Sequence, residues 1–133
     1  MGGAALSIEI VTDPFPTDEA MRRLWRVAWN GEGPESFQPL LGRSLAHVGA
    51  YDGRDLVGFV NVAWDGGVHA FILDTCVDPE HRRQGIAVRL VQRAADVARQ
   101  RGAHWLHVDF EPHLEGFYRQ CGFGPTAAGL MKL

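Results

Sequence analysis

The stretch VHAFILDTCV, residues 68–77, constrains the fold more than any other part of the sequence. It is apolar with almost no alternation, which is the pattern of a strand covered on both faces at the centre of a sheet. Pro79 closes it, and from Ile86 to Arg101 apolar residues recur at helical spacing before Gly102 supplies a stop. A buried strand that leads into a long amphipathic helix predicts a sheet with helices packed on it.

The other elements are predicted from periodicity and turn residues. Alternating or apolar runs indicate strands at residues 6–11, 47–53, 55–66, 104–110 and 128–133. Helical spacing indicates further helices at residues 18–29, 35–46 and 114–120, and Thr17 is available as N-cap of the first. The order β-α-α-β-β-β-α-β-α-β predicts a mixed sheet flanked by helices, in the α/β or α+β class, within one domain over residues 1–133.

Composition narrows the class of partner. Apolar residues make up 46% of the chain, enough for a packed core, and the net charge of −3 argues against nucleic acid, which usually binds a basic face. No run approaches the roughly 18 apolar residues of a membrane helix, and the opening MGGAALS lacks the features of a signal peptide. Cys76 and Cys121 lack zinc or thioredoxin spacing. We therefore expect a soluble, reduced, cytoplasmic domain that binds neither membrane nor nucleic acid nor metal.

The segment RRQGIA, residues 82–87, lies between the apolar strand and the long helix. The first amides of a helix have no partner within it, and together with the helix dipole they favour an anion such as phosphate. Gly85 would let the backbone approach a ligand, and Arg82 and Arg83 would supply forked donors. A solvated loop with surface arginines is the alternative interpretation. Neither a Walker sequence nor GxGxxG is present.

Two motifs together resemble one family. VDPEHRRQGIAVRL, with Arg82, Gly85 and Ala87 at the motif positions, resembles the cofactor signature of the GNAT family of N-acetyltransferases. FYRQCGF, residues 117–123, resembles the late tyrosine-containing element of the same family and lies at the expected distance. The resemblance implies a single GNAT acetyltransferase domain over residues 1–133, with a mixed, mostly antiparallel central sheet whose central strands splay apart.

The resemblance also implies acetyl-CoA as cosubstrate. Its pyrophosphate would lie on the loop before the long helix, and its pantetheine arm would pair with the central strand, where the Val77 amide would donate to the thioester oxygen. The cofactor-binding residues implied are Thr75, Cys76, Val77, Arg82, Arg83, Gln84, Gly85, Ile86, Ala87 and Val88.

The activity implied is direct acetyl transfer to a primary amine of a small molecule or peptide. Tyr118 matches the position of the acid that protonates the departing thiolate. The glutamate that some members carry on the central strand falls at Phe71 here, so Asp109 and Glu111 are the carboxylates that we expect to act in catalysis. Asp74 lies closer, but strand alternation would place it on the face opposite Thr75.

Glu111 departs from the family pattern. Many members have Asn seven residues before the tyrosine, where this chain has Glu111, and Glu115 lies one turn further on. An acidic rim would favour a cationic acceptor, and a solvated acidic loop would have the same sequence. The acceptor itself stays open, and the resemblance is compatible with a homodimer.

Other functions and roles also stay open. A non-catalytic acyl-CoA-binding sensor or partner module would share the cofactor motif, as would a transferase that uses another acyl-CoA. Cys76 lies in an apolar strand, where a thiolate is disfavoured, so we expect a core residue rather than a nucleophile. Trp25, Trp29 and Phe37 flank the loop NGEGP, and we expect core packing for most of them and acceptor contact for one or two.

Overall fold

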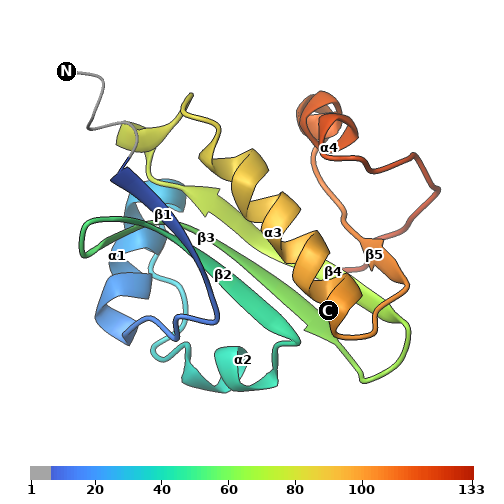
Figure 1. The fold of residues 1–133 in the computed structure, drawn as a ribbon, viewed down its shortest axis with the longest axis horizontal. Helices are drawn as coiled ribbons and strands as arrows, with labels where there is room; N and C mark the ends of the chain where they lie inside the picture. The colour runs from blue at the N-terminus through green and yellow to red at the C-terminus, as the bar shows by residue number, and fades with distance from the viewer. Residues whose placement is uncertain (1–6) are drawn as a thin grey trace.

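The computed structural model describes residues 7–133. These residues form one five-stranded sheet in the order β1-β2-β3-β4-β5, flanked by four α-helices (Figure 1). The strands are β1 (Ile8–Thr12), β2 (Ala46–Asp52), β3 (Asp55–Trp64), β4 (His69–Val77) and β5 (Trp105–His107). The helices are α1 (Asp18–Trp29), α2 (Gln38–Arg43), α3 (Ile86–Gln100) and α4 (Glu115–Gln120), with the short 3-10 turns η2 (Pro79–His81) and η3 (Pro112–Leu114).

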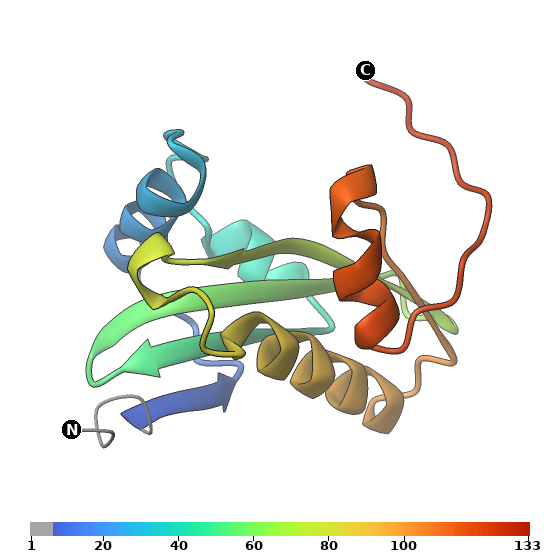
Figure 2. The same ribbon diagram turned by 90° about the horizontal axis from the view of Figure 1, so that it is seen from above.

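The molecule has three layers. From β1 to β4 each strand pairs antiparallel with the next, and β5 pairs parallel with β4. Helices α1 and α2 cover one face of the sheet and α3 covers the other (Figure 2). Met21, Leu24 and Phe37 form one buried cluster on the α1 side, and Leu90 and Ala94 belong to a second cluster on the α3 side. The predicted class, a mixed and mostly antiparallel sheet flanked by helices, is confirmed.

Helix α1 begins and ends where its sequence provides caps. The Thr17 hydroxyl accepts a hydrogen bond from the Ala20 N–H at 3.1 Å, as expected of an N-cap. Asn30 ends the helix in the left-handed conformation and its N–H donates to the Arg26 carbonyl. Between these caps, Met21 and Leu24 are the buried residues of the helix.

Helix α3 lies close to the sheet because glycine leaves room for it. A Cβ atom at Gly58 of β3 would come within 3.0 Å of the Leu90 side chain, so only glycine permits this approach without a shift. The buried residues of α3 recur at helical spacing. Gly102, with φ of 105°, follows the helix and turns the chain toward β5.

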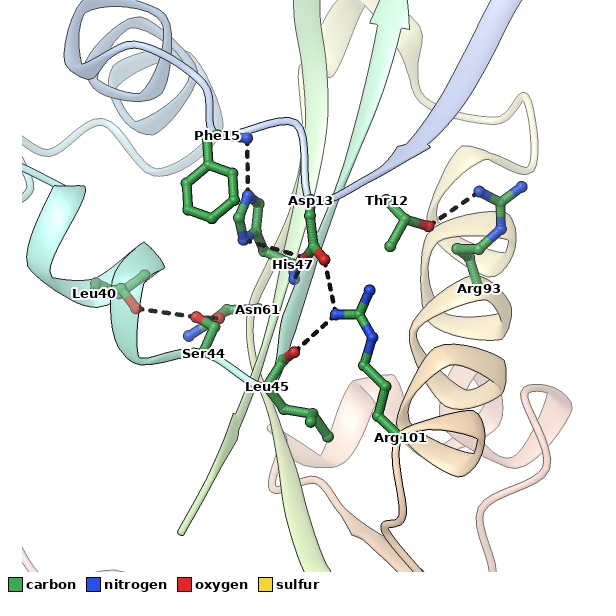
Figure 3. Close-up of polar contacts among 10 residues, drawn as sticks. All are labelled: Thr12, Asp13, Phe15, Leu40, Ser44, Leu45, His47, Asn61, Arg93 and Arg101. Atoms are coloured by element: carbon green, nitrogen blue, oxygen red, sulfur yellow. Dashed lines mark hydrogen bonds and ion pairs between the residues drawn. The ribbon is translucent and has the colours of Figure 1, made fainter. Parts of the chain in front are cut away.

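A polar clasp, formed by Asp13, His47 and Arg101, joins the end of β1, the start of β2 and the end of α3 (Figure 3). Arg101 Nη1 lies 2.7 Å from Asp13 Oδ2 and donates to the Leu45 carbonyl at 2.9 Å. The His47 N–H donates to Asp13 Oδ1 at 3.0 Å, and His47 Nε2 accepts from the Phe15 N–H at 2.9 Å. The clasp therefore satisfies polar groups of three elements at the end of the sheet far from the N-terminus of α3.

The helix predicted at residues 35–46 is shorter than expected. Pro39 lies in the first turn of α2, and the Ser44 hydroxyl donates to the Leu40 carbonyl at 3.0 Å, where the helix ends. The Leu45 N–H already donates to the Val62 carbonyl of β3 at 2.8 Å. Pairing with the sheet therefore ends the helical pattern three residues before the predicted limit.

The strand predicted at residues 128–133 is absent, because residues 121–133 contain neither helix nor strand. Leu130, Met131 and Leu133 are 80% exposed or more. A strand needs a partner for its main-chain groups, and β5 pairs with β4 alone among residues 7–133. The strand predicted at residues 104–110 is likewise reduced to Trp105–His107. Of the first predicted strand, Leu6 lies outside the described residues.

The prediction that β4 is covered on both faces is wrong for its first half. Phe71 is 45% exposed and Leu73 is 41% exposed, whereas Ala70 and Ile72 are buried. These residues alternate as in a strand with one covered face, since helix α3 packs on one side and α1 reaches only the later residues of β4. The apolar residues without a cover lie toward the candidate site.

Candidate active site

Strands β4 and β5 separate soon after they meet. Their parallel ladder consists of three residue pairs and ends at Phe71 and His107, while β4 continues to Val77. Two cavities, of about 580 and 780 Å³, lie against the part of β4 beyond the ladder. The splayed strands that the resemblance implies are therefore present, and they open the candidate site.

The first cavity connects the end of β4 with the N-terminus of α3. Gly85 has φ of 74°, and a Cβ atom built there would meet no heavy atom within 4 Å, so this turn faces open space. No side chain caps α3, unlike α1, which leaves its first amides available to an anion. Arg82 and Arg83 line the same cavity. The turn therefore fits a phosphate group in geometry and in charge.

The main chain of Val77 points toward the splayed side of β4. The Asp78 N–H donates to the Val57 carbonyl at 2.7 Å, and Val77 is opposite Gly58. In an antiparallel ladder alternate residues bond to the same neighbour, so the Val77 N–H points away from β3. It therefore points to the side that β5 has left, where a ligand along β4 would lie.

A β-bulge interrupts β4 at Asp74 and Thr75. One residue of β3, Val60, is opposite these two residues of β4. Asp74 has φ of 60°, which is uncommon for a residue other than glycine. Bulges change the direction of side chains, and Asp74 and Thr75 both line the second cavity. Strict alternation therefore does not determine on which face each of the two side chains lies, because the bulge interrupts it.

Helix α4 places Tyr118 between the two cavities, and the residue lines both. Its ring stacks on Phe110 at a centroid distance of 4.8 Å and meets Phe117 and Phe123 edge-on. Burial raises the pKa of the Tyr118 hydroxyl, and the nearby Thr75 hydroxyl opposes this rise. The hydroxyl therefore stays protonated at neutral pH and can donate a proton.

Thr75, near the end of β4, also lines both cavities. Its Oγ1 is buried and makes no well-aligned hydrogen bond within residues 7–133. The Thr75 side chain is near enough to Tyr118 to lower the pKa of the Tyr118 hydroxyl. The two cavities thus meet at a pair of hydroxyl groups.

Carboxylates gather in the second cavity. Asp74, Asp109 and Glu111 line it, and no lysine or arginine of the described chain does. Burial raises the pKa of Asp74. The Glu111 side chain is 81% exposed, with one carboxylate oxygen 3.7 Å from the Nδ1 of His113. The cavity therefore suits a cationic molecule, with Asp74 as its most enclosed carboxylate.

Most of the residues predicted from sequence come together here. The first cavity is lined by Thr75, Cys76, Val77, Arg82, Arg83, Gly85, Ile86, Ala87 and Val88. Gln84 is exposed and does not line it. Asp109 and Glu111 lie at the second cavity. Glu115, expected at an acidic rim, lines neither cavity and instead pairs with Arg119 at 2.7 Å.

His81 is a cavity residue that sequence reasoning misses. It lines the first cavity, and its Nε2 lies 3.0 Å from Asp52 Oδ2. Its position in the motif, two residues after Pro79, was the available signal. Trp29, expected near the acceptor, lines both cavities, whereas Phe37 is fully buried in the core.

Cys76 is a buried thiol at the first cavity. Burial raises the pKa of the Cys76 thiol to about 12, so it is inert as a nucleophile at neutral pH, as the sequence predicts. Within residues 7–133 no three His, Cys, Asp or Glu side chains are grouped closely enough to hold a metal ion. In the same range, no helix is long and apolar enough to cross a membrane.

Comparison with known proteins identifies the family. A family model described as "Acetyltransferase (GNAT) family" matches residues 9–123. The chain belongs to the GNAT family of acetyltransferases. Its relatives share the GNAT fold over nearly the whole chain. A GNAT family acetyltransferase from Streptococcus pneumoniae superimposes with a TM-score of 0.78 at 26% identity, covering 95% of this chain and 97% of that one.

Two further GNAT relatives bear on the ligands. An aminoglycoside N-acetyltransferase solved in complex with CoA superimposes with a TM-score of 0.75 at 18% identity, covering 95% of this chain and 93% of that one, a likeness of fold alone. Probable glucosamine 6-phosphate N-acetyltransferase 2 of Oryza sativa subsp. japonica is 33% identical over 58 residues, which are 44% of this chain and 35% of that protein. The chain spans about a third of the length of the curated relatives it matches.

Proposed function

We propose that this protein transfers the acetyl group of acetyl-CoA directly to a primary amine of a small molecule or peptide. One observation carries the proposal. The splay between β4 and β5 joins a phosphate-fitting turn, at Gly85, to a second, acidic cavity, and the two cavities meet at Thr75 and Tyr118. A long ligand with a phosphate at one end and an acyl group at the other fits such a path.

The chain's own residues would bind the cofactor at three places. The first amides of α3, with Arg82 and Arg83, would hold the pyrophosphate of acetyl-CoA. The free edge of β4 would pair with the pantetheine arm, which contains amides of its own. The Val77 N–H would donate to the thioester oxygen as negative charge develops on it. A GNAT relative in complex with CoA supports this assignment.

Tyr118 would act as the acid of the reaction. An amine that attacks the thioester expels a thiolate, which gains a proton from a nearby donor. The Tyr118 hydroxyl stays protonated, since burial raises its pKa, and it lies where both cavities meet. Asp109 and Glu111, with Asp74, would supply the negative charge that attracts an ammonium group.

The acceptor would be an amine without a phosphate group. Relatives are named for glucosamine 6-phosphate and for aminoglycosides. A phosphate in the second cavity would meet carboxylates and no lysine or arginine of the described chain. Polycationic or neutral amino sugars would meet the same carboxylates favourably, as would other amines.

The test is release of free thiol from acetyl-CoA in the presence of single acceptors. The panel would contain aminoglycosides, polyamines, peptides, glucosamine and glucosamine 6-phosphate. We expect turnover with cationic amines, and faster turnover with glucosamine than with its phosphate. CoA binding by calorimetry without thiol release from any acceptor would instead indicate a non-catalytic module. Faster release from propionyl-CoA would indicate another acyl donor.

A further inference from the structure

We infer that Asp74, at the β-bulge of β4, is the residue that binds the acceptor's ammonium group and takes its proton. The inference rests on the proposed function and adds a catalytic residue to it. Strand alternation in the sequence would place Asp74 on the face opposite Thr75. From the sequence, Asp109 and Glu111 are therefore the carboxylates expected to act in catalysis. The geometry of the bulge changes this choice.

The first step is the position of the carboxylate. Val60 is opposite both Asp74 and Thr75, and Asp74 lines the second cavity beside Thr75, one of the residues that line both cavities. Val77, whose N–H points to the splayed side, lies three residues further along the same strand. Asp74 is thus fixed on the strand that would hold the acyl group, whereas Asp109 and Glu111 lie on the chain segment beyond β5.

The second step is that Asp74 has no partner within the described part of the fold. Asp74 has no hydrogen bond or ion pair with the residues of the chain from 7 to 133, and burial is the cause of its raised pKa. Its φ of 60° adds backbone strain. An unpaired, partly buried carboxylate in a strained conformation weakens a fold, and such features concentrate at functional sites. A cationic ligand would supply the missing partner.

The third step compares the other carboxylates of the cavity. The Glu111 side chain is 81% exposed and has His113 beside it. Asp109 is exposed and is not enclosed as Asp74 is. A carboxylate in water has an ordinary affinity for protons, whereas an enclosed one is a better base for an ammonium group. Burial raises the pKa of Asp74, in agreement with its enclosed position.

The proton balance is complete with these groups. The Asp74 carboxylate takes a proton from R–NH3+, and the nitrogen lone pair forms the C–N bond with the acetyl carbon. The C–S bond breaks with its electron pair on sulfur, which takes the Tyr118 proton. The nitrogen then gives its second proton to the Tyr118 oxygen, and Asp74 returns its proton to water. The products are the amide, CoA thiol and one proton.

The experiment compares Asp74→Asn with the wild-type protein on two acceptors. One is the best cationic amine of the panel, and the other is methoxyamine, which is uncharged at neutral pH and needs no base. We expect kcat/KM to fall by about 100-fold or more with the cationic amine and to change little with methoxyamine. The exposed Asp55, at the start of β3 and outside both cavities, provides the matched control Asp55→Asn, which should keep the activity.

A second measurement does not depend on turnover. If Asp74 serves the ligand rather than the fold, Asp74→Asn should raise the midpoint of thermal unfolding at neutral pH, since it removes an unpaired charge. A lower midpoint would show a structural role and overturn the inference. Equal losses with both acceptors, or full activity of Asp74→Asn, would also overturn it. Rescue by methoxyamine in Asp109→Asn or Glu111→Gln instead would assign the base to that residue.

Failure of the proposed function has a different signature. If the wild-type protein binds CoA but releases no thiol with any amine, the transferase itself is refuted, and the role of Asp74 with it. If the wild-type protein is active and Asp74→Asn is equally active, only the inference about Asp74 is refuted.

Discussion

At the scale of single residues, burial decides which groups in the site can react. Tyr118 and Cys76 line the same cavity, and burial raises the pKa of both. A raised pKa keeps a phenol ready to donate a proton, but it prevents a thiol from acting as a nucleophile. The same physical effect therefore suits Tyr118 to the acid role that we propose and leaves Cys76 as a packing residue.

Tyr118→Phe tests the acid role. The ring contacts with Phe110, Phe117 and Phe123 would persist, so we expect the fold and the affinity for acetyl-CoA to change little. Turnover should fall by about 100-fold, the usual contribution of one acid. Steady-state kinetics and calorimetry with CoA measure the two quantities. An unchanged kcat would remove Tyr118 from the mechanism.

His47, in the polar clasp, predicts a dependence of stability on pH. Burial lowers the pKa of His47 in the folded state, so the unfolded chain binds more protons near its ordinary value of about 6.5. Stability is then present in full above that value and is lost as the pH falls through the lowered pKa. Urea unfolding at pH 7.5 and 5.5 should give a smaller free energy of unfolding at the lower pH.

The control for this prediction is His47→Gln, whose amide oxygen can still accept the Phe15 N–H. The difference between the two pH values should shrink in His47→Gln and persist in His104→Gln, since His104 is exposed. An undiminished difference in His47→Gln would assign the acid sensitivity to other groups.

At the scale of elements, the turn before α3 combines a backbone requirement with a place in the lining of the first cavity. Gly85 and Gly102 both have positive φ, and a Cβ atom at either would meet no heavy atom within 4 Å. Only Gly85 lines a cavity. The two glycines therefore separate conformational strain from ligand binding, because a side chain strains both positions but blocks the ligand at one.

Gly85→Glu should abolish binding of CoA, since it places a side chain and a negative charge where the phosphate would lie. Gly85→Glu and Gly102→Glu should both lower the free energy of unfolding by about 1–2 kcal/mol, because a side chain is strained in the left-handed conformation. Gly102→Glu should leave CoA binding intact. Calorimetry with CoA and thermal unfolding distinguish the two effects. Retained binding in Gly85→Glu would refute the phosphate role of the turn.

The sequence predicts the elements whose pattern has a local cause. Thr17 caps α1 and Gly102 follows α3, as predicted, because caps depend on a few neighbouring residues. The predicted strand at residues 128–133 fails because a strand also needs a partner, which local pattern does not supply. The sequence does not predict the bulge at Asp74 for a related reason, since the bulge depends on the register between β4 and β3. Within residues 82–88, the motif correctly indicates a cavity for every position except Gln84, whereas the bulge that places Asp74 depends on pairing between strands distant in sequence.

At the scale of the whole molecule, α3 connects the site with the clasp. Residues 85–88 at its N-terminus line the first cavity, and Arg101, directly after its last residue, pairs with Asp13 (Figure 3). Under the proposed function, the two ends of one helix would serve binding and stability separately. Substitutions at the clasp should affect the fold and leave the cofactor site unchanged.

Arg101→Ala tests this separation. It removes the ion pair with Asp13 and the bond to the Leu45 carbonyl, so we expect a loss of about 1.5–3 kcal/mol in the free energy of unfolding. Arg99→Ala is the matched control, because its ion pair with Asp96 is exposed and contributes at most about 1 kcal/mol. Affinity for CoA should be unchanged in both variants. Weaker CoA binding in Arg101→Ala would show that the two ends of α3 are coupled.

The early separation of β4 and β5 has a consequence for the protein without its ligand. Unpaired strand edges recruit other strands, and here the unpaired edge lies inside the sheet rather than at its border. A thioester that lies along β4 would act as a temporary extra strand and block such recruitment. The bound cofactor would then protect the protein from aggregation in addition to taking part in the reaction. Light scattering on warming should show slower aggregation when CoA is added.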